Sequence, residues 1–150
     1  MAIRTILQEN EPLLRKKSRE VLEIDAKILT LLDDMKETLA GAEGVGLAAP
    51  QVGILRRVIL VDTGKEVLEL INPKIVRQSG TQDSCEGCLS VPGVRGHVAR
   101  PKKVTVQGYN RDGDLMEYEA QDFVATIFSH EIDHLDGILF TDKVTKYERD

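Results

Sequence analysis

The chain has 150 residues, of which 41% are hydrophobic and 30% charged, and this size and composition predict one globular domain over residues 1–150. The formal net charge of −5 argues against a broad nucleic-acid-binding surface. No signal-peptide pattern opens the sequence, and no apolar run approaches the roughly 20 residues of a membrane span. Together with only two cysteines, these features predict a protein of the reducing cytoplasm.

Residues 1–20 are expected to form an irregular arm. A helix is predicted from Asp25, which can cap its first turn, to about Ala40, and Gly41 can end it. Its apolar residues recur at steps of three and four, which gives one buried stripe: Ile28, Leu31, Leu32, Met35 and Leu39.

Residues 44–51 are rich in glycine and small side chains. Glycine permits a positive φ or a close approach of the backbone to a ligand. The segment lacks the lysine and the spacing of a phosphate-binding loop, so nucleotide binding is not expected. A tight buried turn is the alternative interpretation.

Strands dominate the middle of the chain. Apolar and β-branched runs predict strands at residues 57–62, 67–72, 74–79, 98–99, 103–109 and 115–120. Residues 63–65 and 110–113 are turn segments that suit hairpins. Residues 89–93 are expected to be extended chain that enters a turn.

A second helix is predicted from about Gln121 to Leu135. Phe123, Ile127, His130 and His134 lie along one helical face, and we expect this face to be buried. Two histidines four residues apart can bind one metal ion, and Glu131 beside them can act as a base toward a metal-bound water.

Such a site needs a third protein ligand. Only 16 residues follow His134, and Phe140 occupies the position where a downstream histidine would continue one known pattern. Upstream candidates are Cys85, Cys88 and His97. The Cys-x-x-Cys spacing also leaves open a redox pair, or a closed structural zinc site with both histidines.

Three segments together resemble the peptide deformylases: Gly44-Val45-Gly46-Leu47-Ala48-Ala49-Pro50-Gln51, Glu86-Gly87-Cys88-Leu89-Ser90 and His130-Glu131-Ile132-Asp133-His134. They occur in the family's order and at its approximate spacing. Two features depart from the family pattern. Ser129 stands where the family usually has glutamine, and little chain follows the second helix to form the longer C-terminal helix of some relatives.

The resemblance implies an α+β fold, with mostly antiparallel β-sheets packed around a central metal-binding helix and with an N-terminal helix. It implies removal of the formyl group from N-terminal formylmethionine, with release of formate. Cys88, His130 and His134 are then the metal ligands, and Glu131 is the general base and acid. The Gln51 amide and the Leu89 backbone N–H are expected to stabilise the oxyanion.

The substrate is expected to contact six further residues: Val45, Gly46, Gly87, Arg95, Phe123 and Ile127. The resemblance favours Fe²⁺ in the cell, and Zn²⁺, Ni²⁺ or Co²⁺ can occupy the site in a purified sample. Expected partners are N-formylmethionyl nascent peptides and, transiently, the ribosome. Neither a membrane nor a specific nucleic-acid sequence is expected.

Two other classes remain open at this point. One is a different metallohydrolase, such as an aminopeptidase-like enzyme, and the other is a structural zinc protein that uses Cys85 as fourth ligand.

We also predict an ion pair between Asp133 and Arg100 beneath the metal helix, because a residue next to His134 points about 100° away from the ion and needs another partner.

Overall fold

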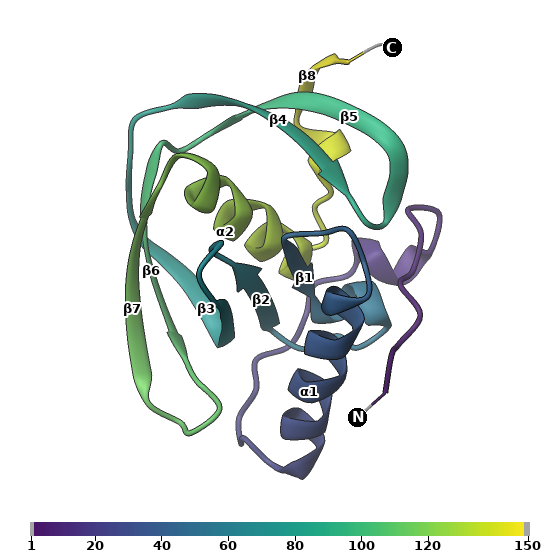
Figure 1. Ribbon diagram of the computed structural model, residues 1–150, viewed down its shortest axis with the longest axis vertical. Helices are drawn as coiled ribbons and strands as arrows, with labels where there is room; N and C mark the ends of the chain where they lie inside the picture. Colours follow the sequence, from purple (N-terminus) through teal and green to yellow (C-terminus); the bar gives the residue numbers. More distant parts are fainter. Residues whose placement is uncertain (1, 149–150) are drawn as a thin grey trace.

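The computed structural model describes residues 2–148 and has the α+β fold expected from the sequence (Figure 1). Its elements, in chain order, are η1 (Pro12–Arg15), α1 (Ala26–Ala40), β1 (Gly46–Ala48), η2 (Ala49–Val52), β2 (Val58–Asp62), β3 (Val67–Ser79), β4 (Gln82–Cys88), β5 (Val91–Arg100), β6 (Lys103–Tyr109), β7 (Leu115–Gln121), α2 (Asp122–Leu135), η3 (Phe140–Asp142) and β8 (Val144–Tyr147). None of the helices within residues 2–148 is long and apolar enough to cross a membrane.

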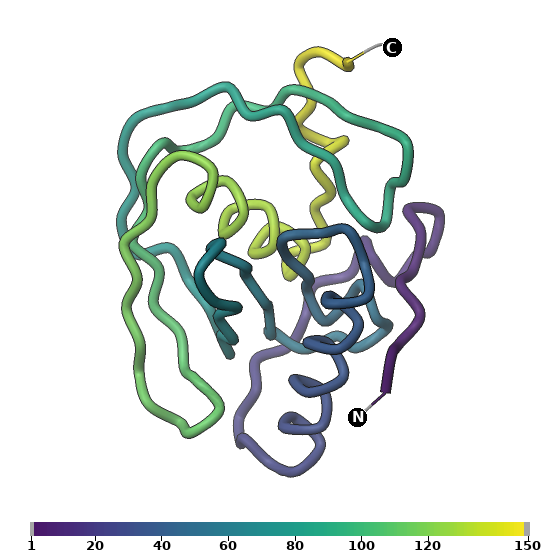
Figure 2. Tube along the Cα trace, viewed as in Figure 1, coloured from purple at the N-terminus to yellow at the C-terminus, as the bar shows by residue number. Residues whose placement is uncertain are grey.

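The strands form two antiparallel sheets. One has the order β1-β2-β3-β6-β7, and the other has the order β4-β5-β8. Helix α2 contacts strands of both sheets, and it lies between them as drawn in Figures 1 and 2. The helix is therefore enclosed, and side chains on opposite sides of it meet different sheets.

Helix α1 forms as the sequence predicts. The Asp25 side chain accepts a hydrogen bond from the Ile28 backbone N–H at 3.1 Å, and Gly41 is the C-cap. Its apolar stripe packs against β1 and β2 in one core cluster, and the opposite side of that sheet joins α2 in another. The five-stranded sheet therefore packs against α1 on one side and against α2 on the other.

The predicted strands at residues 67–72 and 74–79 form a single strand, β3. It stays continuous because a bulge between Ile71 and Lys74 absorbs Pro73, which cannot donate a hydrogen bond to a neighbouring strand. Asn72 has a φ of 53° and bonds the backbone of Val21 through both side-chain atoms, at 2.8 Å each.

Strands β1, β4 and β8 were not expected from the sequence, and β5 is longer than the predicted residues 98–99. Leu89 and Ser90 form the tight turn between β4 and β5, so Val91 begins a strand where the sequence indicated chain entering a turn. Together β4 and β5 make a long hairpin over α2 (Figure 1).

Helix α2 has the predicted bounds, with Gln121 as its N-cap. Ile127, His130 and His134 are buried, but the prediction that Phe123 is buried is wrong, because this side chain is 59% exposed. Phe123 lies in the first turn of the helix, before the enclosed part begins. The chain leaves the other end through Gly137, which has a φ of 75° and lies so close to the Arg15 carbonyl that a Cβ would be 2.4 Å from its oxygen.

Candidate active site

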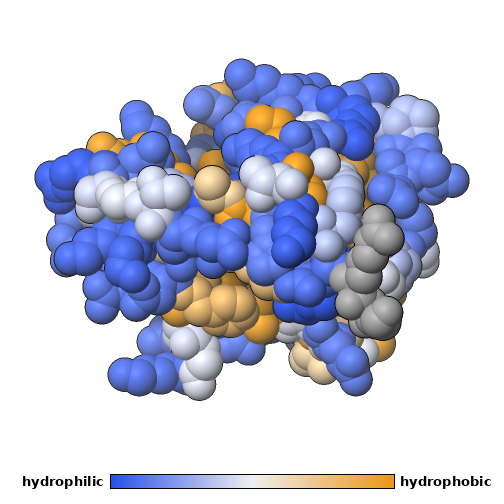
Figure 3. Space-filling model, turned by 90° about the horizontal axis from the view of Figure 1, so that it is seen from above, coloured by the Kyte–Doolittle hydropathy of each residue, from blue (hydrophilic) through white to orange (hydrophobic). Residues whose placement is uncertain are grey.

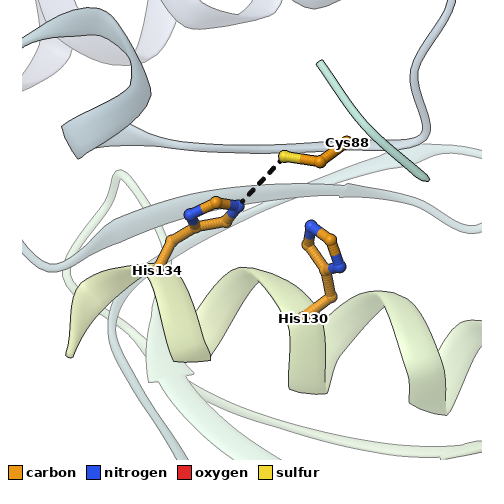
Figure 4. Close-up of side chains that lie close together, drawn as sticks. All are labelled: Cys88, His130 and His134. Carbon is orange, nitrogen blue, oxygen red and sulfur yellow. Dashed lines mark hydrogen bonds between the residues drawn. The ribbon is translucent and has the colours of Figure 1, made fainter. Parts of the chain in front are cut away.

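Cys88, His130 and His134 lie together although they come from two distant parts of the chain (Figure 4). Cys88 is the last residue of β4, and the two histidines lie one turn apart on α2. One donor atom from each residue falls within 4.8 Å of the others, and Cys88 Sγ is 3.4 Å from His134 Nε2. One thiolate and two imidazoles are suitable ligands for a divalent transition metal.

Several features of the protein fit such an ion. Burial holds the pKa of His134 well below its usual value, which keeps the ring neutral and able to ligate. Glu131 Oε1 is buried without a hydrogen-bond partner among the described residues. An unpaired buried polar atom is costly, so its presence indicates that a bound group belongs beside it. His134 Nδ1 is also unpaired there, but it is the ring nitrogen that faces away from Cys88.

The ring of His130 is fixed from behind by Glu86. Its Nδ1 lies 2.9 Å from Glu86 Oε1, which leaves Nε2 on the side of Cys88 and His134. A carboxylate behind a histidine commonly orients it for metal binding. Burial acts to raise the pKa of Glu86, but hydrogen bonds from Arg100 and His130 outweigh it and lower the pKa to about 2. Glu86 is therefore a permanent anion at neutral pH.

Arg100 completes this network. Its Nε and Nη2 donate to the two oxygens of Glu86 at 2.7 and 2.8 Å, and its Nη1 donates to Asp133 Oδ2 at 2.6 Å. The predicted pair between Asp133 and Arg100 is confirmed, and Lys143 also binds Asp133 at 3.0 Å. The sequence did not indicate that Glu86 lies between Arg100 and His130. This residue projects inward because side chains alternate along β4.

Glu131 lies on the same helix, next to His130, and is buried. Burial raises the pKa of its carboxyl to about 7. Gly46 of β1 lies against it so closely that a Cβ on Gly46 would come within 2.6 Å of Glu131 Oε2. In the segment of residues 44–51, the backbone at Gly46 therefore comes close to Glu131, and the absence of a side chain on Gly46 leaves room for the Glu131 carboxylate.

Gln51 is held in a defined orientation by η2 and its surroundings. Its Oε1 accepts from the Ala48 N–H at 2.9 Å. Its Nε2 donates to Ser90 Oγ at 3.1 Å and points toward Cys88 Sγ at 3.5 Å. The amide donor therefore faces Cys88, one of the three candidate ligands, as the family resemblance implied.

A cleft of about 560 Å³ opens beside these groups. All the predicted site residues except His134 line it: Val45, Gly46, Gln51, Gly87, Cys88, Leu89, Arg95, Phe123, Ile127, His130 and Glu131. Phe123 thus borders the cleft although it is not buried. Sequence analysis did not select Thr126, which also lines the cleft and whose buried Oγ1 lacks a partner among residues 2–148. Only its place one turn before His130 could have indicated it.

Cys85 is not part of this group. It lies near His97 and Glu148 in a separate set of donors, and both cysteines are free. A closed site made of both cysteines and both histidines, and a redox disulfide, therefore find no support in the described part of the chain. Two histidines, one cysteine and a buried carboxylate beside a cleft are the arrangement of a metallohydrolase.

Comparison with known proteins agrees. The family model described as polypeptide deformylase matches residues 3–150. A peptide deformylase of Alkaliphilus metalliredigens is 57% identical over 146 residues, which are 97% of this chain and 99% of the relative. The chain therefore belongs to the polypeptide deformylase family, whose members are hydrolases that remove the N-formyl group from nascent peptides.

Solved structures show the same fold. The crystal structure of peptide deformylase from Thermotoga maritima superposes with a TM-score of 0.94 at 36% identity and covers 97% of this chain and 99% of its own. A class I type b peptide deformylase from Acinetobacter baumannii with bound Met-Ala-Ser gives a TM-score of 0.89 at 33% identity, over 95% of this chain and 98% of its own.

Proposed function

We propose that this protein deformylates N-formylmethionyl peptides with a divalent metal ion held by Cys88, His130 and His134. The observation that carries the proposal is the buried Glu131 carboxylate, whose Oε1 has no partner in the described chain and which follows His130 on α2 and lines the same cleft as His130 and Cys88. A divalent ion held by these three residues would supply Lewis acidity, which would make an attacking water more acidic.

Glu131 transfers the proton, and Gln51 and Leu89 stabilise the charge that develops on the substrate. Glu131 takes a proton from the attacking water and later delivers it to the leaving amine nitrogen. The oxygen of the formyl carbonyl gains negative charge during the attack. The Gln51 Nε2 donor, whose orientation is fixed by Ala48 and Ser90, and the Leu89 backbone N–H stabilise that charge.

Substrate selection follows from the shape of the cleft. The formyl group is the smallest acyl group, and the narrow space between Gly46, Gln51 and Leu89 excludes acetyl. Phe123 and Ile127 contact the methionine side chain, and Val45, Gly87 and Arg95 contact the peptide backbone. The Met-Ala-Ser peptide bound by the Acinetobacter baumannii relative has the composition expected of a product in this reaction.

Fe²⁺ is the ion we propose for the cell, with Zn²⁺, Ni²⁺ and Co²⁺ as substitutes in purified protein, because all accept imidazole and thiolate ligands. The proposed setting is the cytoplasm, in transient contact with the ribosome.

The test is formate release from formyl-Met-Ala-Ser, measured with and without a chelator, beside unformylated Met-Ala-Ser. We expect release of formate that the chelator abolishes and no cleavage of the unformylated peptide. Cleavage of Met-Ala-Ser would instead identify an aminopeptidase, and activity that survives complete removal of metal would exclude the proposed role of the three ligands.

A further inference from the structure

The outer face of the β4–β5 hairpin carries a second group of metal-binding side chains. One donor atom from each of Cys85, His97 and Glu148 lies within 4.8 Å of the others. Cys85 of β4 and His97 of β5 are directly opposite each other in the antiparallel register. Cys85 lies between the inward-facing Ser84 and Glu86, so the alternation of the strand points its side chain to the opposite face of the sheet from theirs, although Cys85 and Glu148 also border the cleft.

His97 is held as metal-binding histidines commonly are. Its Nδ1 lies 2.8 Å from Asp83 Oδ2, and its Nε2 faces Glu148 Oε1. A carboxylate behind one ring nitrogen fixes the tautomer that leaves the other nitrogen free to bind a metal. The pair of His97 and Asp83 thus repeats, on the outer face, the arrangement of His130 and Glu86 on the inner face.

We propose that Cys85, His97 and Glu148 form a second metal site, for a borderline divalent ion such as Zn²⁺, with Asp83 orienting the His97 ring. Around one tetrahedral Zn²⁺ the donor atoms lie roughly 3.5 Å apart, as follows from bond lengths of about 2.0–2.3 Å. Donors already within 4.8 Å would reach that spacing by small rotations of the half-buried Cys85 and His97 and the exposed Glu148. Water completes the coordination.

The surroundings suit a cation that enters from solvent. The side chains of Asp83 and Glu148 are 69% and 50% exposed, while that of His97 is 23% exposed. The face of the molecule seen from above is mostly hydrophilic (Figure 3). Hydrogen bonds to Glu148 and Asp83 also raise the pKa of His97, so a proton competes with the ion. The ion therefore binds more weakly here than at the buried Cys88 site.

A bound ion would join three segments. Cys85 lies on β4, His97 lies on β5, and Glu148 follows β8, so one ion ties the edge strand and the hairpin together. Arg95 contacts two of the three proposed ligands. Its backbone oxygen accepts a hydrogen bond from the Glu148 N–H at 3.0 Å, and its Nη2 donates to the Cys85 carbonyl at 3.3 Å. An effect on substrate through Arg95 rests on the proposed function, whereas the metal site itself does not.

Metal stoichiometry tests the site directly. The full chain, stripped of metal, is dialysed against a buffered free Zn²⁺ concentration, and bound zinc is measured by elemental analysis. We expect two equivalents for the wild type and one each for Cys85→Ser and His97→Gln. Cys88→Ser should also bind one equivalent, held at the outer site. Glu117→Gln, a change to an exposed carboxylate on β7, is the matched control and should keep two.

Cobalt provides an independent reading, because each thiolate bound to Co²⁺ adds a ligand-to-metal charge-transfer absorption. The wild type at saturation should show about twice the absorption of Cys85→Ser. One equivalent in the wild type, or two in both Cys85→Ser and His97→Gln, would overturn the proposal. Neither result depends on whether the protein releases formate.

Discussion

Replacing Arg100 by methionine removes the centre of the ion network behind His130, and the cost can be estimated from its contacts. The Arg100 and Glu86 side chains are 2% and 4% exposed, so the change leaves a buried carboxylate that has lost two of its hydrogen bonds. Breaking a buried ion pair costs about 3–5 kcal/mol. Asp133 keeps Lys143 as a partner, and Glu86 keeps His130 and can become protonated, so we expect about 3 kcal/mol, the lower end of that range.

Arg111→Met is the matched control. Arg111 also bridges two carboxylates, Asp33 and Glu69, at 2.9 and 2.6 Å, but its side chain is 34% exposed. Solvent reaches Arg111 and weakens its two pairs, although the Glu69 side chain is only 11% exposed, so this variant should lose clearly less stability than Arg100→Met. The comparison separates the effect of burial from the number of ion pairs, because each arginine contacts two carboxylates.

The assay is urea unfolding of metal-free protein in the presence of chelator, because a bound ion would itself stabilise the folded state. Thermal unfolding should show the same order, with Arg100→Met lowered by roughly 6–12 °C at about 2–4 °C per kcal/mol for a chain of this size. Equal losses in the two variants, or a loss below about 1 kcal/mol for Arg100→Met, would refute the reasoning about burial.

Three further predictions concern other parts of the molecule. Gly46→Ala should lower the rate of formate release while the metal content stays unchanged, because the new Cβ would lie 2.6 Å from Glu131 Oε2; an unchanged rate would show that the carboxylate is free to move. Asp34→Asn should destabilise the protein above about pH 4, because hydrogen bonds from the Ala2 backbone and Arg4 outweigh burial and hold the pKa of Asp34 below its usual 3.8. The difference in unfolding free energy between the wild type and Asp34→Asn should shrink as the pH falls below 3.8 and through the lower pKa of the folded state. A difference that stays constant in urea titrations from pH 7 to pH 3 would contradict this prediction. Formate release by Fe²⁺-loaded enzyme should decay in air while the Ni²⁺-loaded enzyme keeps its activity, since iron and its thiolate ligand can be oxidised; equal decay of both would disprove the role of iron.

Helices α1 and α2 and the strands of the five-stranded sheet other than β1 could be predicted, because their sequences carry clear local signals. Helix α1 has a capping aspartate and a regular apolar stripe, and β2 and β6 are rich in β-branched residues. Strand β4 has neither signal, because its sequence QDSCEGC is polar and contains no β-branched residue. Pairing with β5 alone makes it a strand, and local propensity contains no information about that partner.

The same limit applies to the site. The spacing of the two histidines placed them on one face of a helix, whereas the choice of Cys88 over Cys85 needed the family resemblance or the structure. The position of Glu86 behind His130 could not be predicted without the register of β4, because alternation along the strand decides which side of the hairpin a residue faces. Phe123 follows the helical period of the histidines but lies in the first turn of α2, where it borders the open cleft and is exposed.

The most direct test of the central claim is formate release from formyl-Met-Ala-Ser by Glu131→Gln, with the metal content of the same sample measured by elemental analysis. If Glu131 moves the proton and Cys88, His130 and His134 hold the ion, the variant keeps the metal content of wild-type protein loaded in the same way. Its turnover should then fall by at least about a hundredfold, the scale of general acid–base catalysis. A metal-loaded variant with wild-type turnover, or a variant that has lost its metal, would contradict this division of roles.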